Sequence, residues 1–192
     1  MGRTREFDVE RTLHQCMEVF WEKGFQTTCL DDLTETTGVK KQSLYGAFEN
    51  KRALFLKALS LYREQSISQL EELASDEAPP MEQLQAVGNL VLGYTNENCK
   101  GCLIINTALE FGSSDEEVLR EVETMYAETE RILSTIIVRG QDQQQITRRH
   151  TAPELAAHLT NVIRGSQVLA KSGVSADQSG AVLKTAFSLL AP

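Results

Sequence analysis

Apolar residues recur every three or four positions through most of this 192-residue chain, which is the spacing of amphipathic helices rather than of strands. The first such stretch runs from about Val9 to Lys23, with Asp8 as its N-cap and Gly24 as its stop. Further helices are predicted over residues 51–74, 80–97, 102–111, 114–138, 151–172 and 177–190. We expect the helices that begin at residues 114 and 151 to be capped by Ser114 and Thr151. The pattern therefore predicts an all-α fold.

Residues 28–51 predict two short helices joined at Gly38, which is the pattern of a DNA-binding helix-turn-helix. We expect Thr28 to cap the first helix, with Asp31 completing a capping box. Gly38 ends that helix, because glycine readily adopts the left-handed conformation of a helix C-cap. The second helix turns Leu44 and Phe48, which are four residues apart, toward the inside and exposes a polar face. That face consists of Lys40, Lys41, Gln42, Ser43 and Tyr45. A generic helical hairpin with a solvated face is the alternative interpretation.

One ordered motif within this segment consists of Gly38-Val39, Leu44-Tyr45, Phe48 and Lys51. It resembles the DNA-binding domain of the TetR family of transcriptional repressors. The resemblance extends upstream to the amphipathic helix that ends at Gly24-Phe25, and so covers roughly the first sixty residues. Beyond that point it weakens to helix number and length. It implies an N-terminal three-helix helix-turn-helix domain, residues 1–52, and a C-terminal six-helix ligand-binding and dimerisation domain, residues 53–192.

The resemblance also implies roles in DNA binding, position by position. Residues 40–43 form the first turn of the recognition helix, where lysine and glutamine side chains can address guanine and adenine edges. Tyr45 and Lys51 resemble the phosphate contacts of the family. We expect Thr28, with the backbone amides of its helix, to hold another phosphate.

The net charge of −8 argues at first sight against a nucleic-acid partner. Dividing the chain after Arg52 leaves eight basic against nine acidic residues before it, so −1 there and −7 in the remainder. DNA contact must therefore be local, and we expect it to depend strongly on salt. No apolar run approaches the ~20 residues that cross a bilayer, and the N-terminus lacks the apolar core of a secretion signal. We expect a cytoplasmic protein without membrane association.

Cys102, Asn106 and Glu110 are spaced by four residues, so they share one face of an otherwise apolar helix. Cys102 is expected at the helix N-terminus, where the dipole and free amides lower the pKa of a thiol. The segment resembles the Gly-Cys-Leu…Asn…Glu stretch of one TetR-family branch, some members of which sense electrophiles, oxidants or quinone-like compounds. Lys171 is expected to approach the thiol. The alternative is that Cys102 is an ordinary buried residue and the two polar side chains make caps or interhelix contacts.

We expect a small-molecule inducer, whose identity the sequence does not contain, in a pocket among the fourth to eighth helices. The predicted lining is Phe55, Leu59, Tyr62, Tyr94, Asn106 and Met125. Inducer binding, or modification of Cys102, is expected to tilt the helix over residues 51–74 and change the spacing of the recognition helices.

A protein that recognises two DNA half-sites related by two-fold symmetry must itself be a symmetric dimer, and the family resemblance implies one. The last two long helices, residues 151–172 and 177–190, are rich in small residues that permit close helix approach. Packing within one chain is the alternative use of these faces. We expect a homodimer, formed through these two helices, on a near-palindromic double-stranded DNA operator.

Two other classes of function compete with this interpretation. Cys99 and Cys102 form a Cys-x2-Cys pair, which alone is half a zinc site, although a two-thiolate Cu(I) site would make a metal-responsive regulator. A small-molecule binding protein that has lost DNA binding is the second alternative. No phosphate-binding loop or catalytic triad occurs by spacing, so we expect neither a cofactor nor an enzyme activity.

Overall fold

The computed structural model describes residues 7–93 and 100–192, apart from the side chains of Val91, Leu92 and Ala176. The regular secondary structure of this part is helical, as predicted. Its nine helices are α1 (Val9–Lys23), α2 (Leu30–Thr37), α3 (Lys41–Phe48), α4 (Lys51–Ser75), α5 (Pro80–Gly93), α6 (Leu103–Phe111), α7 (Glu116–Asp142), α8 (Ala152–Lys171) and α9 (Ala176–Ser188).

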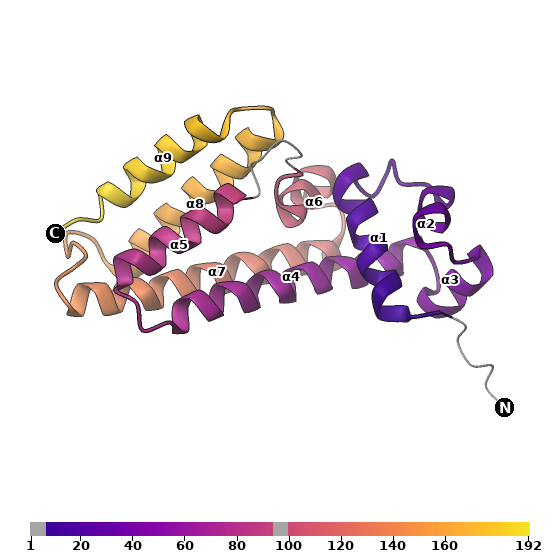
Figure 1. Ribbon diagram of the computed structural model, residues 1–192, viewed down its shortest axis with the longest axis horizontal. Coiled ribbons are helices and arrows are strands. Elements are labelled where there is room, and N and C mark those ends of the chain that lie inside the picture. The colour runs from indigo at the N-terminus through magenta and orange to yellow at the C-terminus, as the bar shows by residue number, and fades with distance from the viewer. Residues whose placement is uncertain (1–6, 94–99) are drawn as a thin grey trace.

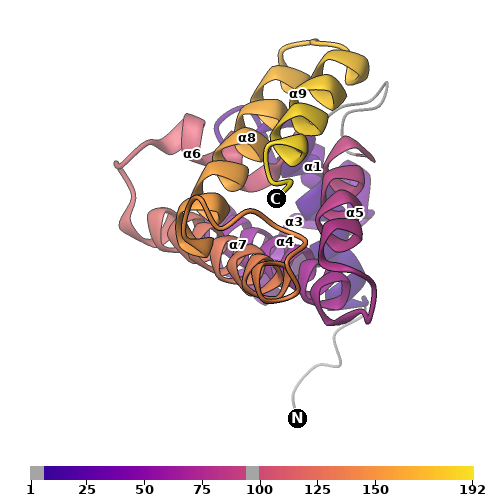
Figure 2. The ribbon, with the colours of Figure 1, turned by 90° about the vertical axis from the view of Figure 1, so that its left-hand side faces the viewer.

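The molecule is elongated, with α1, α2 and α3 at one end and the C-terminus at the other (Figure 1). The long helices α4 and α7 pack side by side along the long axis and connect the two ends. Seen along that axis, α8 and α9 lie on one side of the α4–α7 pair, with α5 beside them (Figure 2). The short helix α6 lies next to α1, so it stands between the helix-turn-helix and the rest of the molecule (Figure 1).

Two apolar cores hold these helices together. The first extends from α1–α3 into α4, α6 and the start of α7, and the second lies among α4, α5, α7, α8 and α9. Large buried members of the first core are Phe20, Phe48, Phe55 and Leu103. The first core crosses the predicted domain boundary at residue 52, so shared burial ties the helix-turn-helix to the helices that follow it.

Several predicted helix ends are confirmed. The Asp8 side chain caps α1 by accepting a first-turn amide hydrogen bond at 3.1 Å, and Gly24 ends that helix with a φ of 81°. Gly38 ends α2 in the left-handed conformation. Thr151 caps α8 and forms a capping box with Glu154. Each of these ends depends on one residue acting on its own chain neighbours, which a sequence pattern can reveal.

The predicted cap of α2 is wrong by one residue. Cys29 is the N-cap: its Sγ accepts a hydrogen bond from the Asp32 amide at 3.4 Å, and the Asp32 carboxylate accepts one from the Cys29 amide at 2.7 Å. Asp31, the predicted partner, is exposed. Thr28 is buried, and its hydroxyl donates to the Gly24 carbonyl at 2.5 Å. That bond orients the Thr28 side chain toward the end of α1, and the amide of the first turn of α2 bonds to Cys29 instead.

Both predicted ends of α7 also differ. Asp115, not Ser114, caps it, accepting two first-turn amide hydrogen bonds at 3.1 and 3.2 Å. The helix continues through Gly140 to Asp142, beyond its predicted end at residue 138. A Cβ at Gly140 would lie 2.4 Å from Cδ1 of Ile146. Glycine therefore provides room for packing there and does not end the helix.

The remaining differences are small. α6 begins at Leu103, so Cys102 is its N-cap residue and makes no side-chain capping hydrogen bond. α9 is capped by Ser175 and ends at Ser188 rather than residue 190. The predicted extension of α5 to residue 97 lies outside the described residues. No helix of the described part is long and apolar enough to cross a membrane.

Candidate DNA interface and regulatory cavity

The recognition helix α3 exposes its polar first turn. Leu44 and Phe48 are buried, as their spacing predicted, while residues 41–43 are exposed. Lys40 is exposed at the N-cap position and its side chain makes no capping hydrogen bond. Neither Lys40 nor Lys41 takes part in an ion pair within the described part of the chain. Both ammonium groups are therefore available to an external anion.

The predicted phosphate contacts differ in accessibility. Tyr45 is half-buried on α3. Lys51 is half-buried at the first turn of α4, with its Nζ 4.5 Å from the centroid of the Phe25 ring. Thr28 is only 1% exposed, so α2 presents backbone amides and the exposed Cys29 at this end instead of the threonine hydroxyl.

Glu110 contacts the DNA-binding unit directly. Its carboxylate accepts hydrogen bonds from the backbone amides of Phe25 at 3.0 Å and Gln26 at 2.6 Å. Gly24 makes this approach possible, because a Cβ there would lie 3.0 Å from Oε2 of Glu110. The sequence placed Glu110 on one face with Cys102, but the structure uses it to hold the loop after α1 against α6.

A second contact holds α1 at the other end of α6. Nε1 of Trp21 donates a hydrogen bond to the Gly101 carbonyl at 3.0 Å. Nζ of Lys100 forms an ion pair with Glu18 at 2.6 Å and lies 5.6 Å from the centroid of the Trp21 ring. Because Gly101 immediately precedes Cys102, α1 is bonded to the chain one residue from that thiol.

A third contact joins the start of α4 to the start of α7. Nη2 and Nε of Arg52 donate to the Asp115 carboxylate at 2.8 and 3.1 Å, and Nη1 lies 2.6 Å from Glu117. Desolvation works to raise the pKa of Asp115, but first-turn amides and the Arg52 guanidinium hold that pKa below its ordinary value. Asp115 therefore stays ionised at neutral pH and the pair persists.

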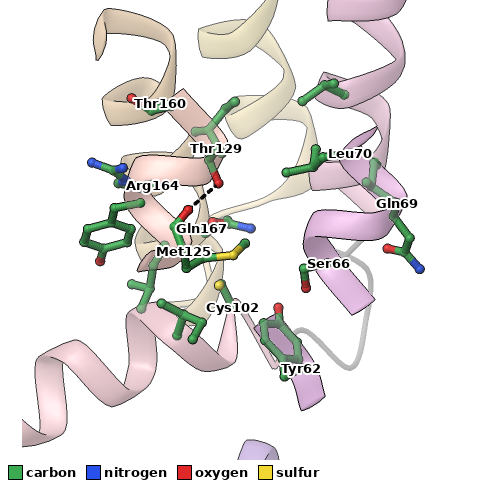
Figure 3. A pocket seen from close by; sticks show the side chains of 16 residues that line it. Tyr62, Ser66, Gln69, Leu70, Cys102, Met125, Thr129, Thr160, Arg164 and Gln167 are labelled. Atoms are coloured by element: carbon green, nitrogen blue, oxygen red, sulfur yellow. Dashed lines mark hydrogen bonds between the residues drawn. The ribbon is translucent and has the colours of Figure 1, made fainter. Parts of the chain in front are cut away.

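A cavity of about 70 Å³ lies among α4, α5, α6, α7 and α8 (Figure 3). Its wall is mainly apolar, and the side chains that bring polar or sulfur atoms to it include Tyr62, Ser66, Cys102, Met125, Thr129 and Gln167. Sequence reasoning missed Ser66 and Gln167. Ser66 lies four residues after Tyr62, and Gln167 lies four residues after Ile163. A polar side chain on an otherwise apolar helix face was therefore the available signal.

Only part of the predicted lining borders this cavity. Tyr62 and Met125 do. Phe55 and Leu59 lie in the first core instead, with the Phe55 ring centroid 4.9 Å from that of Phe25. The Asn106 amide turns back to donate to the Lys100 carbonyl at 2.7 Å. Tyr94 lies outside the described residues.

Cys102 lies in the cavity wall and is 5% exposed. Burial raises the pKa of its thiol, although first-turn amides of α6 and a hydrogen bond with Tyr62 act to lower it. The expected thiolate-favouring effect of the helix N-terminus is therefore outweighed. Nζ of Lys171 donates to the Lys100 carbonyl at 3.4 Å, which brings it to the segment just before the thiol.

The predicted metal pair is incomplete in the described part of the chain, because Cys99 lies outside it. No group of three or more His, Cys, Asp or Glu side chains that could hold a metal ion occurs among the described residues.

A helix-turn-helix with available lysines, joined to a cavity-bearing helical bundle, defines a DNA-binding transcription regulator. Residues 13–58 match the family described as bacterial regulatory proteins, tetR family, and residues 80–185 match the tetracyclin repressor-like C-terminal domain. The chain therefore belongs to the TetR family.

Individual relatives agree with this assignment. The chain is 27% identical to the transcriptional repressor ComR of Escherichia coli (strain K12), covering 98% of this chain and 91% of ComR. It is 34% identical to the transcriptional regulator YezE of Bacillus subtilis (strain 168), covering 85% of this chain and 86% of YezE. These proteins are transcriptional regulators and not enzymes, as we expected of this chain.

Solved structures show the same fold. Reduced NemR of E. coli, 21% identical, superposes with a TM-score of 0.85 over 95% of this chain and 96% of NemR. A cysteine-substituted form of the TetR-family regulator CifR, in complex with 26-base-pair operator DNA, is 26% identical with a TM-score of 0.84 over 98% of this chain and 100% of CifR. The protein is a DNA-binding transcriptional repressor.

Proposed function

We propose that the protein binds a near-palindromic operator as a homodimer and leaves it when a small molecule occupies the cavity among α4–α8. One observation carries this proposal: the segment over residues 100–111 serves both sites. Cys102 forms part of the cavity wall, while Gly101 and Glu110 bond to the DNA-binding unit. A ligand that displaces the wall also displaces these contacts, and it shifts the equilibrium by its differential affinity for the two states.

The available polar face of α3 supports major-groove reading. Residues 40–43 would contact base edges, and Tyr45 and Lys51 would contact phosphates. At α2 the backbone amides would hold the phosphate, because the Thr28 side chain is buried. In a dimer the two recognition helices would lie one helical turn apart, about 34 Å, or a small multiple of it.

Exposed apolar residues on α8, on α9 and at the C-cap of α9 support a dimer interface made by these two helices. Leu169, Val182 and Leu189 are 43%, 46% and 65% exposed. Gly165, also exposed on α8, has no atom within 4 Å of the place where a Cβ would lie. A partner helix could therefore approach α8 closely and cover the apolar side chains.

Modification of Cys102 is a second route to release, supported by its place in the cavity wall. Its burial and raised pKa oppose that route, because the thiolate is the reacting form. A conformation that opens the cavity would have to precede the reaction. The ligand route needs no such change in protonation.

The first test is to incubate the purified, reduced protein with fragmented DNA from its source and to sequence the retained fragments. A Lys40→Ala, Tyr45→Phe variant serves as the control. Recovery of near-palindromic sites by the natural protein alone would support the proposal. Recovery of single half-sites would refute binding to DNA as a dimer. No enrichment of any DNA at low salt would favour a small-molecule binding protein that has lost DNA recognition.

A further inference from the structure

We infer that the ligand of the α4–α8 cavity is a compact, uncharged molecule with an apolar body and one polar group, which pairs with the carboxamide of Gln167. This inference rests on the proposed function of the cavity as the inducer site. It adds the size, the charge and the polar anchor of the ligand, none of which follows from the presence of a cavity alone.

The size follows from the volume of the cavity. One water-sized probe needs about 10–15 Å³ of such space, and an engineered cavity of about 150 Å³ holds benzene. The 70 Å³ present here therefore admits about three to five non-hydrogen atoms. Larger ligands would have to displace wall residues such as Leu70, which is 7% exposed and packed in the second core.

The polar anchor is Gln167. This residue is 9% exposed, and its side chain makes no hydrogen bond within the described part of the chain, although it borders the cavity. Figure 3 shows it converging with Met125 and Cys102 at the centre of the lining residues. The carboxamide is not among the fully enclosed polar atoms that lack a partner in the described part of the chain, so its N and O atoms face space that a small molecule can enter. A ligand that both accepts from its NH2 group and donates to its oxygen would satisfy it.

The charge follows from the rest of the wall. The described lining contains no Asp, Glu, Lys or His side chain. Its one charged residue, Arg164, has its guanidinium 3.8 Å from the centroid of the Tyr126 ring and Nη2 3.7 Å from Glu130. Figure 3 shows that guanidinium turned away from Gln167 and Cys102. A charged ligand beside Gln167 would thus lose its hydration without gaining an ionic partner among the described residues that line this part of the cavity.

Arg164 also defines the competing interpretation. Its Nη2 is buried without a hydrogen bond, so an anion that reached it would be stabilised. Three probes of the same shape and number of non-hydrogen atoms separate the possibilities: propionamide, propionate and propionamidinium. Only the first is uncharged, and it alone carries the donor and acceptor that complement Gln167 without a charge.

Trp21 provides the readout, because it is the only tryptophan in the chain. Its ring centroid lies 4.9 Å from that of Tyr62, which lines the cavity. Titration of the purified, reduced full-length protein should give a saturable change in tryptophan fluorescence with propionamide. Binding of propionate and propionamidinium should be at least about tenfold weaker. Equal or tighter binding of either ion, or no saturable binding of propionamide, would overturn the inference.

Three variants sharpen the test. Gln167→Met keeps the volume and should weaken propionamide binding at least about tenfold, while Gln85→Met, at an exposed position of α5, should leave binding unchanged. Leu70→Ala enlarges the cavity and should admit benzamide, which the natural protein should exclude. Unchanged propionamide binding by Gln167→Met, with normal thermal unfolding, would refute the assigned anchor. Tight benzamide binding by the natural protein would refute the size limit.

A measurement of operator binding tests the proposed function separately from the inferred class of ligand. The captured operator is titrated with the natural protein in the presence and absence of saturating propionamide. Binding of propionamide without operator release would uphold the ligand class and refute induction through this cavity. Normal operator binding without any response of Trp21 to the probes would refute the ligand class and leave the repressor intact.

Discussion

Removal of the Glu110 carboxylate should loosen the DNA-binding unit from the rest of the molecule. Glu110 accepts hydrogen bonds from two backbone amides of the loop after α1, those of Phe25 and Gln26, at 3.0 and 2.6 Å. In Glu110→Ala both amides lose their acceptor. The Gln26 bond is exposed and water can replace it, whereas the Phe25 bond is partly buried.

The magnitude follows from these two bonds. A hydrogen bond to a charged group contributes about 1.5–3 kcal/mol, and rehydration of the exposed amide recovers part of one bond. We therefore expect Glu110→Ala to lower the free energy of unfolding by about 2 kcal/mol, which is a decrease in Tm of about 4–8 °C for a chain of this size. Glu110→Gln retains one acceptor oxygen and should lose about 1 kcal/mol.

Urea and thermal unfolding at one fixed protein concentration measure these changes, since dimerisation makes Tm depend on concentration. Glu123→Ala is the matched control, because Glu123 is exposed on α7. A loss below about 0.5 kcal/mol for Glu110→Ala, the range of ordinary surface substitutions, would refute the reasoning.

Gly24 gives an independent check on the same contact. Gly24→Ala should destabilise the protein in two ways. The backbone at this position has a φ of 81°, which strains any residue with a Cβ, and the new Cβ would lie 3.0 Å from the Glu110 carboxylate. In the Glu110→Ala background the second effect disappears. The double variant should therefore be more stable than the two single losses predict by addition. Simple additivity would show that the carboxylate does not lie against Gly24.

Three further outcomes are expected. Lys41→Ala should weaken operator binding by about 1–3 kcal/mol, while Lys57→Ala, at an exposed site on α4, should leave it unchanged. Equal losses of affinity for the two variants in fluorescence anisotropy titrations would contradict a base contact by Lys41. Iodoacetamide at neutral pH should label the exposed Cys29 before Cys102, whose raised pKa delays its thiolate to higher pH; mass spectrometry showing the reverse order would refute the buried thiol. Leu169→Glu should convert the dimer to a monomer in size-exclusion chromatography with light scattering, and an unchanged dimer would exclude that face.

Local chemistry explains which helix ends were predictable. Asp8 and Thr151 act on amides of their own helices, so the pattern identified them correctly. At α2 and α7, two adjacent residues could each have served as cap. Thr28 bonds to the end of α1 and Ser114 bonds to the Phe111 carbonyl, so the neighbouring residue caps the helix in both cases.

The cavity lining was harder to predict, because α4 contributes to both cores. Phe55 and Leu59 belong to the core shared with the helix-turn-helix, while Tyr62 and Leu70 border the cavity. The apolar stripe of α4 does not reveal where along the helix its packing partners change from the helices of the first core to those that surround the cavity. Ser66 and Gln167 were missed for the same reason: a polar residue becomes informative only when the helices that enclose it are known.

The order of helices, the inward and outward faces of α3 and the membership of the TetR family all follow from residues close together in the chain. They are read from spacing, from capping chemistry and from one continuous motif. The bonds from Glu110 to the loop after α1 join residues 84 and 85 positions apart, and the bond from Trp21 to Gly101 spans 80. Only tertiary packing brings such groups together. The same packing buries Cys102 and raises the pKa that its helix position alone would lower.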